Sequence, residues 1–341
     1  MIPASLHERN LRALLAPIAD LLAEREVSEV MINGPAQIYA ERHGRLLLTE
    51  HRFADGDALM AALRGVAQYA GRTLGPDDPI LEARLPDGSR VEAVIPPAAP
   101  DGPIVSIRRF ARTAFTLAQL VARGSVHRDG ADQLLALVAQ RKNVLVAGGT
   151  GSGKTSLLQA LCAAIPRDQR IVVIEDSREL QLPHPQVVQL EAQPADARGR
   201  GRISVRQLFC ATLRLRPDRI VVGELRGPEA LELIQAMTSG HGGCLSTLHA
   251  TTPHDALARL ETLASMSDVG LPLAALRAQI GSAIDAVVQT HRREDGSRGV
   301  HEIALLAHSR RGYALRSVYR EQDEPAAEES AAARGSGSEA A

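Results

Sequence analysis

The chain has few aromatic residues and few cysteines. Trp is absent, Phe and Tyr number four each, and aromatic residues make up only 2% of the 341 residues. Because hydrophobic residues still reach 45%, the core must be built from Ala, Leu, Val and Ile. The three cysteines, Cys162, Cys210 and Cys244, are an odd and scattered set, which excludes a disulfide framework.

Long apolar runs and an excess of one charge are also missing. No run of about 18 apolar residues occurs, so we expect no transmembrane span. The acidic residues Glu8, Asp20 and Glu24 near the start disfavour a signal peptide. A net charge of −1 disfavours nucleic acid as the main partner. We therefore expect a cytoplasmic protein, in which any membrane association comes through partners.

Local patterns divide the chain into an N-terminal and a C-terminal domain. Residues 1–110 mix helical spacing, short strands and a hairpin at Pro86-Asp87-Gly88, which predicts an α+β domain. Residues 111–125 are predicted to form a linker and a first helix. Residues 126–320 alternate aliphatic strands with helices, which predicts an α/β domain with a largely parallel sheet covered on both faces.

The last part of the chain carries weaker patterns. Residues 283–320 are expected to form a helix followed by strands around "REDGSRG" and "SRRG". Residues 321–341, "EQDEPAAEESAAARGSGSEAA", are polar, acidic and of low complexity, which predicts a disordered tail.

A glycine-rich segment, "GGTGSGKT", follows an apolar run that ends at Ala147. It matches G-x-x-x-x-G-K-[ST] in the strand–loop–helix context of a P-loop, whose backbone N–H groups surround phosphate oxygens. Lys154 is expected to reach the β- and γ-phosphates, and the Thr155 hydroxyl to ligate Mg²⁺. The predicted ATP-binding residues are Gly148, Gly149, Thr150, Gly151, Ser152, Gly153, Lys154, Thr155 and Ser156.

Two further aliphatic strands end in carboxylates. "RIVVGE" ends at Glu224, and "IVVIED" ends at Glu175-Asp176. Because ligands bind at the carboxyl ends of such strands, one acid can hold Mg²⁺ and another can orient water. A lone acid here could equally cap a helix, but two acids beside a P-loop favour chemistry.

The segment "GHGGCLSTLHATTPH" groups His241, Cys244, His249 and His254. The spacing H-x₂-C-x₄-H-x₄-H lacks the short pairs that structural zinc sites prefer. His249 is expected at the end of an apolar strand, and Pro253 to begin a helix that turns His254 away. Cys244 is expected to pack as a small hydrophobic residue, so the pattern disfavours zinc.

The motifs in this order resemble those of the secretion (traffic) ATPases of type II and type IV secretion systems and type IV pili. They are the P-loop at 148–155, an Asp box at 174–179, a degenerate Walker B at 220–224 and a His box at 240–250. "LRLRPDRIVVGELRG" and "INGPAQIYAERHGRL" further resemble the tight-adherence pilus branch, which includes relatives labelled conjugal-transfer ATPases.

The resemblance implies a homo-hexameric ring in which ATP and Mg²⁺ lie between the N-terminal domain and a RecA-like domain. It implies Glu175 as the catalytic glutamate, with Glu224 assisting Mg²⁺ through water. It places His249 on the γ-phosphate side, with His241 beside it. It also implies N-terminal arginines over the phosphates, where a guanidinium suits the charge of phosphoryl transfer. The candidates are Arg84, Arg90, Arg108 and Arg109.

The sequence therefore predicts an ATP-hydrolysing hexameric motor for pilus assembly or protein secretion, of the tight-adherence or type II kind, that works with inner-membrane platform proteins. The alternative is a type IV secretion or conjugal-transfer ATPase. A RecA-type nucleic-acid motor is disfavoured by the few stacking aromatics. A nucleotide kinase is disfavoured by the domain that precedes the P-loop.

Overall fold

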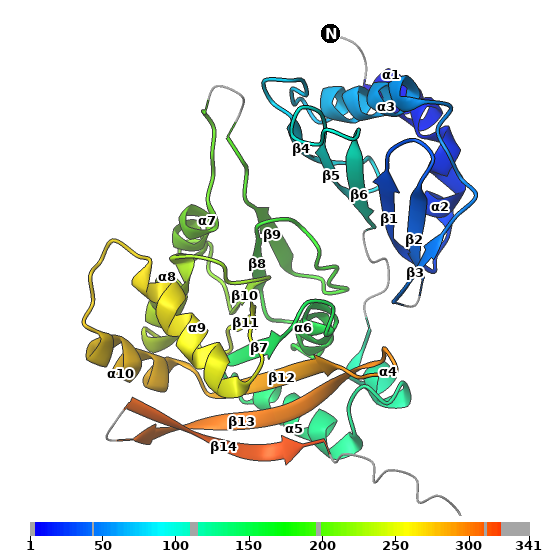
Figure 1. Cartoon of the computed structure of the whole chain (residues 1–341). Coiled ribbons are helices and arrows are strands. Elements are labelled where there is room, and N and C mark those ends of the chain that lie inside the picture. The colour runs from blue at the N-terminus through cyan, green and yellow to red at the C-terminus, as the bar shows by residue number, and fades with distance from the viewer. Residues whose placement is uncertain (1–3, 43, 110–114, 196–198, 310–311, 322–341) are drawn as a thin grey trace, which may run out of the picture.

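The computed structural model describes residues 4–42, 44–109, 115–195, 199–309 and 312–321. These residues form two sheets, one in each half of the chain, and Figure 1 shows them as separate bodies. One core cluster belongs to the N-terminal sheet, and two clusters cover the faces of the C-terminal sheet. The linker residues 110–114 and the tail residues 322–341 lie outside the described part, so the predicted domain boundaries remain a prediction.

The N-terminal domain is a six-stranded antiparallel sheet with the order β3-β2-β1-β6-β5-β4. Its helices share one aliphatic core with the sheet. Pro17 sits in a 3₁₀ turn between the first two helices, as its missing N–H requires. The helices are α1 (Ala4–Leu14), α2 (Ala19–Ala23) and α3 (Gly56–Tyr69). The strands are β1 (Val27–Asn33), β2 (Ile38–Arg42), β3 (Arg45–Leu48), β4 (Ile80–Arg84), β5 (Arg90–Val94) and β6 (Ile104–Arg108).

The C-terminal domain is an eight-stranded sheet with the order β14-β13-β12-β7-β11-β10-β8-β9. The six strands from β12 to β9 are parallel, whereas β13 and β14 are antiparallel additions at one edge. The predicted largely parallel α/β sheet is confirmed. The strands are β7 (Val144–Gly148), β8 (Ile171–Glu175), β9 (Val187–Glu191), β10 (Arg219–Val222), β11 (Leu245–His249), β12 (Ala286–Arg292), β13 (Arg298–Ser309) and β14 (Gly312–Arg320).

Helices cover both faces of this sheet (Figure 1). One face packs against α4 (Leu117–Ala122), α5 (Arg128–Ala139) and α6 (Lys154–Ala163). The other face packs against α7 (Val205–Thr212), α8 (Glu229–Thr238), α9 (Pro253–Ser265) and α10 (Leu273–Ala283). Within the described residues, no helix has the length and apolar character needed to cross a membrane.

The parallel register carries the sequence motifs to one edge of the sheet. β7 ends at Gly148, β8 at Glu175, β10 just before Gly223 and β11 at His249. Because parallel strands share the direction of their carboxyl ends, the P-loop, Asp box, Walker B and the end of the His box meet there.

One prediction near the C-terminus is wrong. The helix expected from residue 283 onward ends at Ala283 as α10, and the following residues form β12 beside β7. The buried run Ala286–Val288 is a core strand rather than a helix face. Glu321, predicted as the first tail residue, is ordered: its N–H donates to the His301 carbonyl at 2.8 Å.

A buried arginine fixes the entry to β11. Arg219 is only 1% exposed, and its Nη2 donates to the Val138 carbonyl at 2.8 Å. Gly243 has φ of +81°, and a Cβ there would lie 2.1 Å from Arg219 Nη1. We expect Gly243→Ala to lower the free energy of unfolding by roughly 2–4 kcal/mol, through backbone strain and overpacking. The control is Gly270→Ala, because φ there is +62° but the space around the Cβ position is open. The difference in thermal stability between the two variants measures the cost of the clash with Arg219. Equal losses in both variants would contradict it.

Candidate active site

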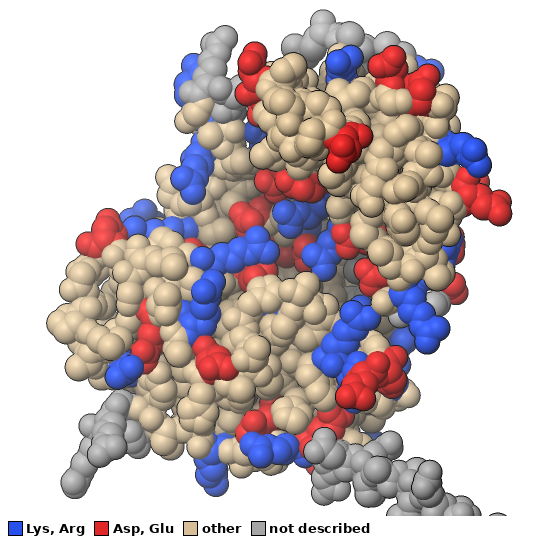
Figure 2. All heavy atoms as spheres, in the orientation of Figure 1, with Lys and Arg blue, Asp and Glu red and all other residues tan. Residues whose placement is uncertain are grey.

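A pocket with a volume of about 430 Å³ lies between the two domains. Its walls come from the P-loop, from Glu175 to Leu180, from the Walker B end, from His249 and from N-terminal residues that include Arg108. Figure 2 shows basic and acidic side chains close together along the hollow between the domains. The pocket therefore joins a phosphate-binding loop to arginines from a separate body.

The P-loop is shaped by two glycines. A Cβ on Gly148 would lie 2.2 Å from Thr290 Oγ1 and 2.4 Å from Ser152 Oγ, so no larger residue fits. Gly153 has φ of +97° and caps α6, whose amino terminus opens at Lys154. The Oγ atoms of Ser152 and Thr290 lie 2.8 Å apart, so β12 holds the loop from the side. Thr290 was missed in the sequence because its strand carries no motif.

Lys154 and Glu224 are joined by His249. Lys154 Nζ donates to the carbonyls of Gly148 at 3.0 Å and Gly149 at 2.8 Å and lies 3.3 Å from His249 Nδ1. Nε2 of the same ring lies 3.1 Å from Glu224 Oε1. Burial lowers the pKa of His249, and the charge of Lys154 acts in the same direction. A neutral ring with its proton on Nε2 satisfies both neighbours.

Glu224 also contacts an arginine absent from the predicted site. Arg226 Nη2 donates to Glu224 Oε2 at 2.8 Å, and Arg226 Nη1 lies 3.5 Å from Asp176 Oδ2. Burial acts to raise the pKa of Glu224, but the Arg226 hydrogen bond and nearby positive charges outweigh it and lower that pKa. Glu224 is thus held ionised, as a carboxylate near Mg²⁺ must be. The sequence signal that could have identified Arg226 was its position, two residues after Glu224.

Glu175 is more deeply buried than Glu224. The residue is 4% exposed, and its Oε1 accepts from the N–H groups of Glu179 at 2.8 Å and Leu180 at 3.0 Å. Among the described residues its buried Oε2 has no hydrogen-bond partner. Burial raises the pKa of Glu175 to about 7. A pocket carboxylate with one tethered and one open oxygen is suited to accept a proton near neutral pH.

This pKa predicts a pH dependence of activity. Only the ionised form of Glu175 can accept a proton, so kcat/KM for ATP should rise as pH increases through about 7. Initial rates of phosphate release at fixed ionic strength measure this dependence. A kcat/KM that stays constant from about pH 6 to about pH 8 would contradict it.

The same pKa also predicts a pH dependence of stability. Burial raises the pKa of Glu175 in the folded state above its ordinary value of 4.5. The proton on Glu175 therefore stabilises the fold fully below pH 4.5, and this stabilisation is lost as the pH rises to about 7. Glu175→Gln removes this loss. Over that pH interval the variant should become more stable relative to the wild type, by up to roughly 3 kcal/mol in the free energy of unfolding. Thermal unfolding at several pH values measures this difference. A constant difference between the two proteins across the interval would exclude a titrating Glu175.

Three of the four predicted arginines form a row across neighbouring strands. Arg84 pairs in register with Arg90, and Arg90 pairs with Arg108. Arg90, Arg108 and Arg109 line the pocket. Arg108 is exposed, and its charge is one of the causes that lower the pKa of Lys154, after burial.

Arg84 is a correction. It does not line the pocket; its Nη2 lies 2.7 Å from Glu191 Oε1 and also contacts the Ser177 hydroxyl. Arg90 lies 3.8 Å from Glu179 and 3.0 Å from Glu82. The contacts with Ser177 and Glu179 join the N-terminal sheet to the loop after β8, and the contact with Glu191 joins it to the end of β9. Arg109 is held within its own domain, where its Nη1 donates to the Val27 carbonyl at 3.0 Å.

His241 is a second correction. It precedes β11 at the amino end of the strand, whereas His249 ends the strand in the pocket. His241 therefore does not face the same space as His249. Cys244 is buried, which raises its pKa to about 12, and His254 lies exposed in the first turn of α9. The strand thus distributes the four side chains between different places.

The residues present fit a nucleotide with Mg²⁺. The P-loop opens a helix amino terminus, Thr155 lines the pocket, and Lys154 and Arg108 supply positive charge. The unpartnered Oε2 of Glu175 and the ionised Glu224 supply oxygen atoms of the kind that Mg²⁺ and its water shell prefer. Gly223 makes room here, because a Cβ on it would lie 2.9 Å from Glu175 Cγ.

Fold and site define a P-loop nucleotide-binding protein with a parallel α/β core. The chain belongs to the family described as Type II/IV secretion system protein, whose model matches residues 12–333. It is 37% identical over 292 residues to a putative conjugal transfer protein of Mycobacterium tuberculosis, covering 84% of this chain and 82% of that one. It is 37% identical over 299 residues to the type IV secretion system protein PtlH of Bordetella pertussis, covering 80% and 87%.

A solved structure shares the fold. The crystal structure of the pilus retraction motor PilT with bound ADP matches with a TM-score of 0.61 at 19% identity, covering 87% of this chain and 84% of that one. The RecA-like core and the secretion ATPase family predicted from the motifs are confirmed. The tight-adherence branch is not specifically supported, because these sequence relatives are named for type IV secretion and conjugal transfer.

Proposed function

We propose that this chain is an ATP-hydrolysing motor of a type IV secretion or conjugal-transfer system. The observation that carries the proposal is the pocket in which a P-loop, Glu175, Glu224 and His249 meet arginines of the other domain. The names of the relatives favour the type IV alternative over tight adherence.

The charge of each pocket residue determines its role in ATP hydrolysis. Thr155 and Glu224 would hold Mg²⁺, which would supply positive charge to neutralise the phosphates. Lys154 leaves the Gly148 and Gly149 carbonyls and binds the phosphates. Glu175 accepts the proton of the attacking water at Oε2, and Glu224 orients water around the cation. His249, between Lys154 and Glu224, links phosphate contact to the Walker B carboxylate.

Arg108 supplies the contact from the N-terminal domain. Its strand neighbour Arg90, which lies 3.8 Å from Glu179, and Arg84, which contacts the Ser177 hydroxyl, join that domain to the loop after Glu175. Phosphates entering the pocket compete for the guanidinium groups of Arg90 and Arg108, so binding and release shift the N-terminal domain. In a homo-hexameric ring such shifts move cargo. The proposed partners are inner-membrane platform proteins, which hold the ring at the cytoplasmic face of the membrane.

The enzymatic part is tested by phosphate release from Mg²⁺–ATP. We expect free phosphate as the product, at a rate that DNA does not change. Arg108→Ala should slow release by about 10³–10⁵-fold if it stabilises the transition state. Arg45→Ala, on the far edge strand β3, should leave the rate unchanged. Transfer of phosphate to an acceptor, or DNA-stimulated release, would overturn the motor assignment.

The biological part is tested by deleting the gene in the source organism. We expect loss of conjugative transfer or of type IV secretion, restored by the wild-type gene but not by one encoding Lys154→Ala. Intact transfer together with loss of surface pili would instead support the tight-adherence interpretation.

A further inference from the structure

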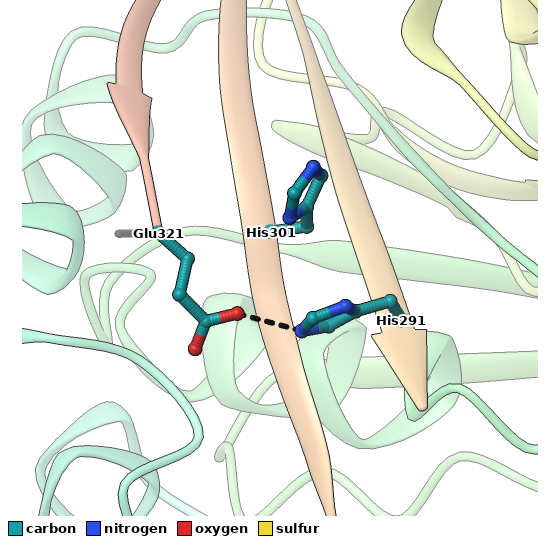
Figure 3. A group of neighbouring side chains, drawn as sticks. All are labelled: His291, His301 and Glu321. Atoms are coloured by element: carbon teal, nitrogen blue, oxygen red, sulfur yellow. Dashed lines mark ion pairs between the residues drawn. The ribbon is translucent and has the colours of Figure 1, made fainter. Parts of the chain in front are cut away.

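Three side chains of the types that ligate metals come together across β12, β13 and the end of β14, outside the P-loop pocket. His291 lies on β12, His301 on β13 and Glu321 directly after β14 (Figure 3). One nitrogen of each ring and one carboxylate oxygen all lie within 4.8 Å of one another. Sequence distance hid this group, because 30 residues separate its first and last members.

Backbone register brings the group together. His291 is paired with Gly299, which has no side chain to fill the space between the strands. A register shift pairs Thr290 with Val300 but Gln289 with Glu302, so His301 is the extra residue of a bulge. Bulges redirect side chains and often lie beside functional sites. The Glu321 N–H donates to the His301 carbonyl at 2.8 Å, which places Glu321 beside that bulge.

The polar contacts leave room for a ligand. Nε2 of His291 lies 2.6 Å from Oε2 of Glu321, yet this buried nitrogen makes no directed hydrogen bond to any described residue. Arg293 contacts the other oxygen, Oε1. Gly299 is needed for this, since a Cβ there would lie 2.4 Å from Arg293 Nη2. The side chains of His291 and Glu321 are 34% and 12% exposed, so the group lies near the surface rather than deep in the core.

We propose that His291, His301 and Glu321 bind a divalent transition-metal ion of the Zn²⁺ type. Two imidazoles and one carboxylate form a ligand set that Zn²⁺ accepts, whereas Mg²⁺ prefers oxygen ligands. A tetrahedral ion with bonds of about 2.0–2.2 Å holds its ligand atoms roughly 3.3 Å apart. Small side-chain rotations reach that spacing, and solvent takes the fourth position. Arg293 stays on Oε1 and orients the carboxylate from outside the ligand shell.

The ion would fasten the end of β14 to a hairpin that supports the nucleotide site. Thr290, next to His291, donates to the Ala147 carbonyl at 3.0 Å and contacts Ser152 of the P-loop. Arg292 donates to the Gly44 carbonyl of the N-terminal domain at 2.9 Å. The three ligands themselves do not line the pocket, so Zn²⁺ binding can be measured without ATP hydrolysis.

Calorimetric titration of Zn²⁺ into metal-stripped full-length protein tests the site. Excess Mg²⁺ competes for oxygen-ligand sites such as Glu224 during the titration. We expect one equivalent of Zn²⁺ to bind with a micromolar or lower Kd. His301→Asn keeps the His291–Glu321 contact but removes a ligand, so it should weaken binding by at least about 10- to 100-fold. His254→Asn removes an exposed histidine on α9 and should bind like the wild type.

Two results would overturn the proposal: no Zn²⁺ binding by the wild type, or equal affinity in His301→Asn. Circular dichroism checks that the variants fold. If His301→Asn does not fold, the absorption spectrum of the Co²⁺-loaded wild type decides the question. Nitrogen and oxygen ligands give no sulfur charge-transfer band, whereas such a band would assign the ion to the exposed Cys210 instead.

Discussion

Replacing Glu175 by glutamine should stop ATP hydrolysis while leaving ATP binding intact. The amide keeps the shape of the side chain and can still accept from the Glu179 and Leu180 N–H groups, but it cannot accept a proton at the Oε2 position. A general base contributes about 10²–10⁴-fold to the rate. We expect turnover to fall by that factor. Phosphate release measures turnover, and a fluorescent ATP analogue measures binding.

Glu302→Gln is the matched control for this variant. Glu302 is also a buried strand glutamate, 9% exposed, but it pairs with Arg320 at 2.9 Å and does not line the pocket. Its replacement should leave turnover near the wild-type rate. Retained turnover in Glu175→Gln would transfer the role of the base to Glu224.

Lys154→Ala should abolish both tight ATP binding and turnover. Lys154 is the cation beside the P-loop carbonyls, and alanine leaves the phosphate charge there without its partner. Loss of a charged hydrogen bond and of a transition-state donor together predicts a fall in kcat/KM of roughly 10³–10⁵-fold. Steady-state kinetics give this ratio, and equilibrium titration with ADP separates its binding part.

The only other lysine of the chain, Lys142, supplies the control. It precedes β7 at the edge of the sheet away from the P-loop and lies 2.8 Å from Asp285. Lys142→Ala should therefore change stability slightly and kinetics not at all. Similar kcat/KM values for Lys154→Ala and the wild type would mean that nucleotide binds elsewhere.

The sequence predicted those parts of the site that depend on local chemistry. A strand, a glycine loop and a helix amino terminus follow each other along the chain, so the P-loop from Gly148 to Thr155 needed no tertiary information. Glu175 and Glu224 end aliphatic strands, and the parallel sheet places such ends together. His249 followed the same rule. The structure places all of these around one pocket.

What the sequence did not predict depends on contacts between distant segments. Arg84 and Arg108 look alike in sequence, yet Arg84 lies beside Glu191 of the other domain and Arg108 lines the pocket. His241 and His249 are eight residues apart in sequence. His241 lies before the amino end of β11 and His249 is its last residue, so the strand holds the two side chains at opposite ends. Glu321 belongs to an acidic tail by composition, and only β13 and β14 pairing brings it to His291 and Arg293.

A mixing experiment tests the central claim of a ring-shaped ATP-hydrolysing motor most directly. Phosphate release is measured at constant wild-type concentration while Glu175→Gln protein is added in increasing excess. In a ring whose protomers work together, inactive subunits that bind ATP enter mixed rings and stall them. We expect total turnover to fall well below the wild-type value. Turnover that stays constant would show that each protomer hydrolyses ATP alone and would contradict the motor.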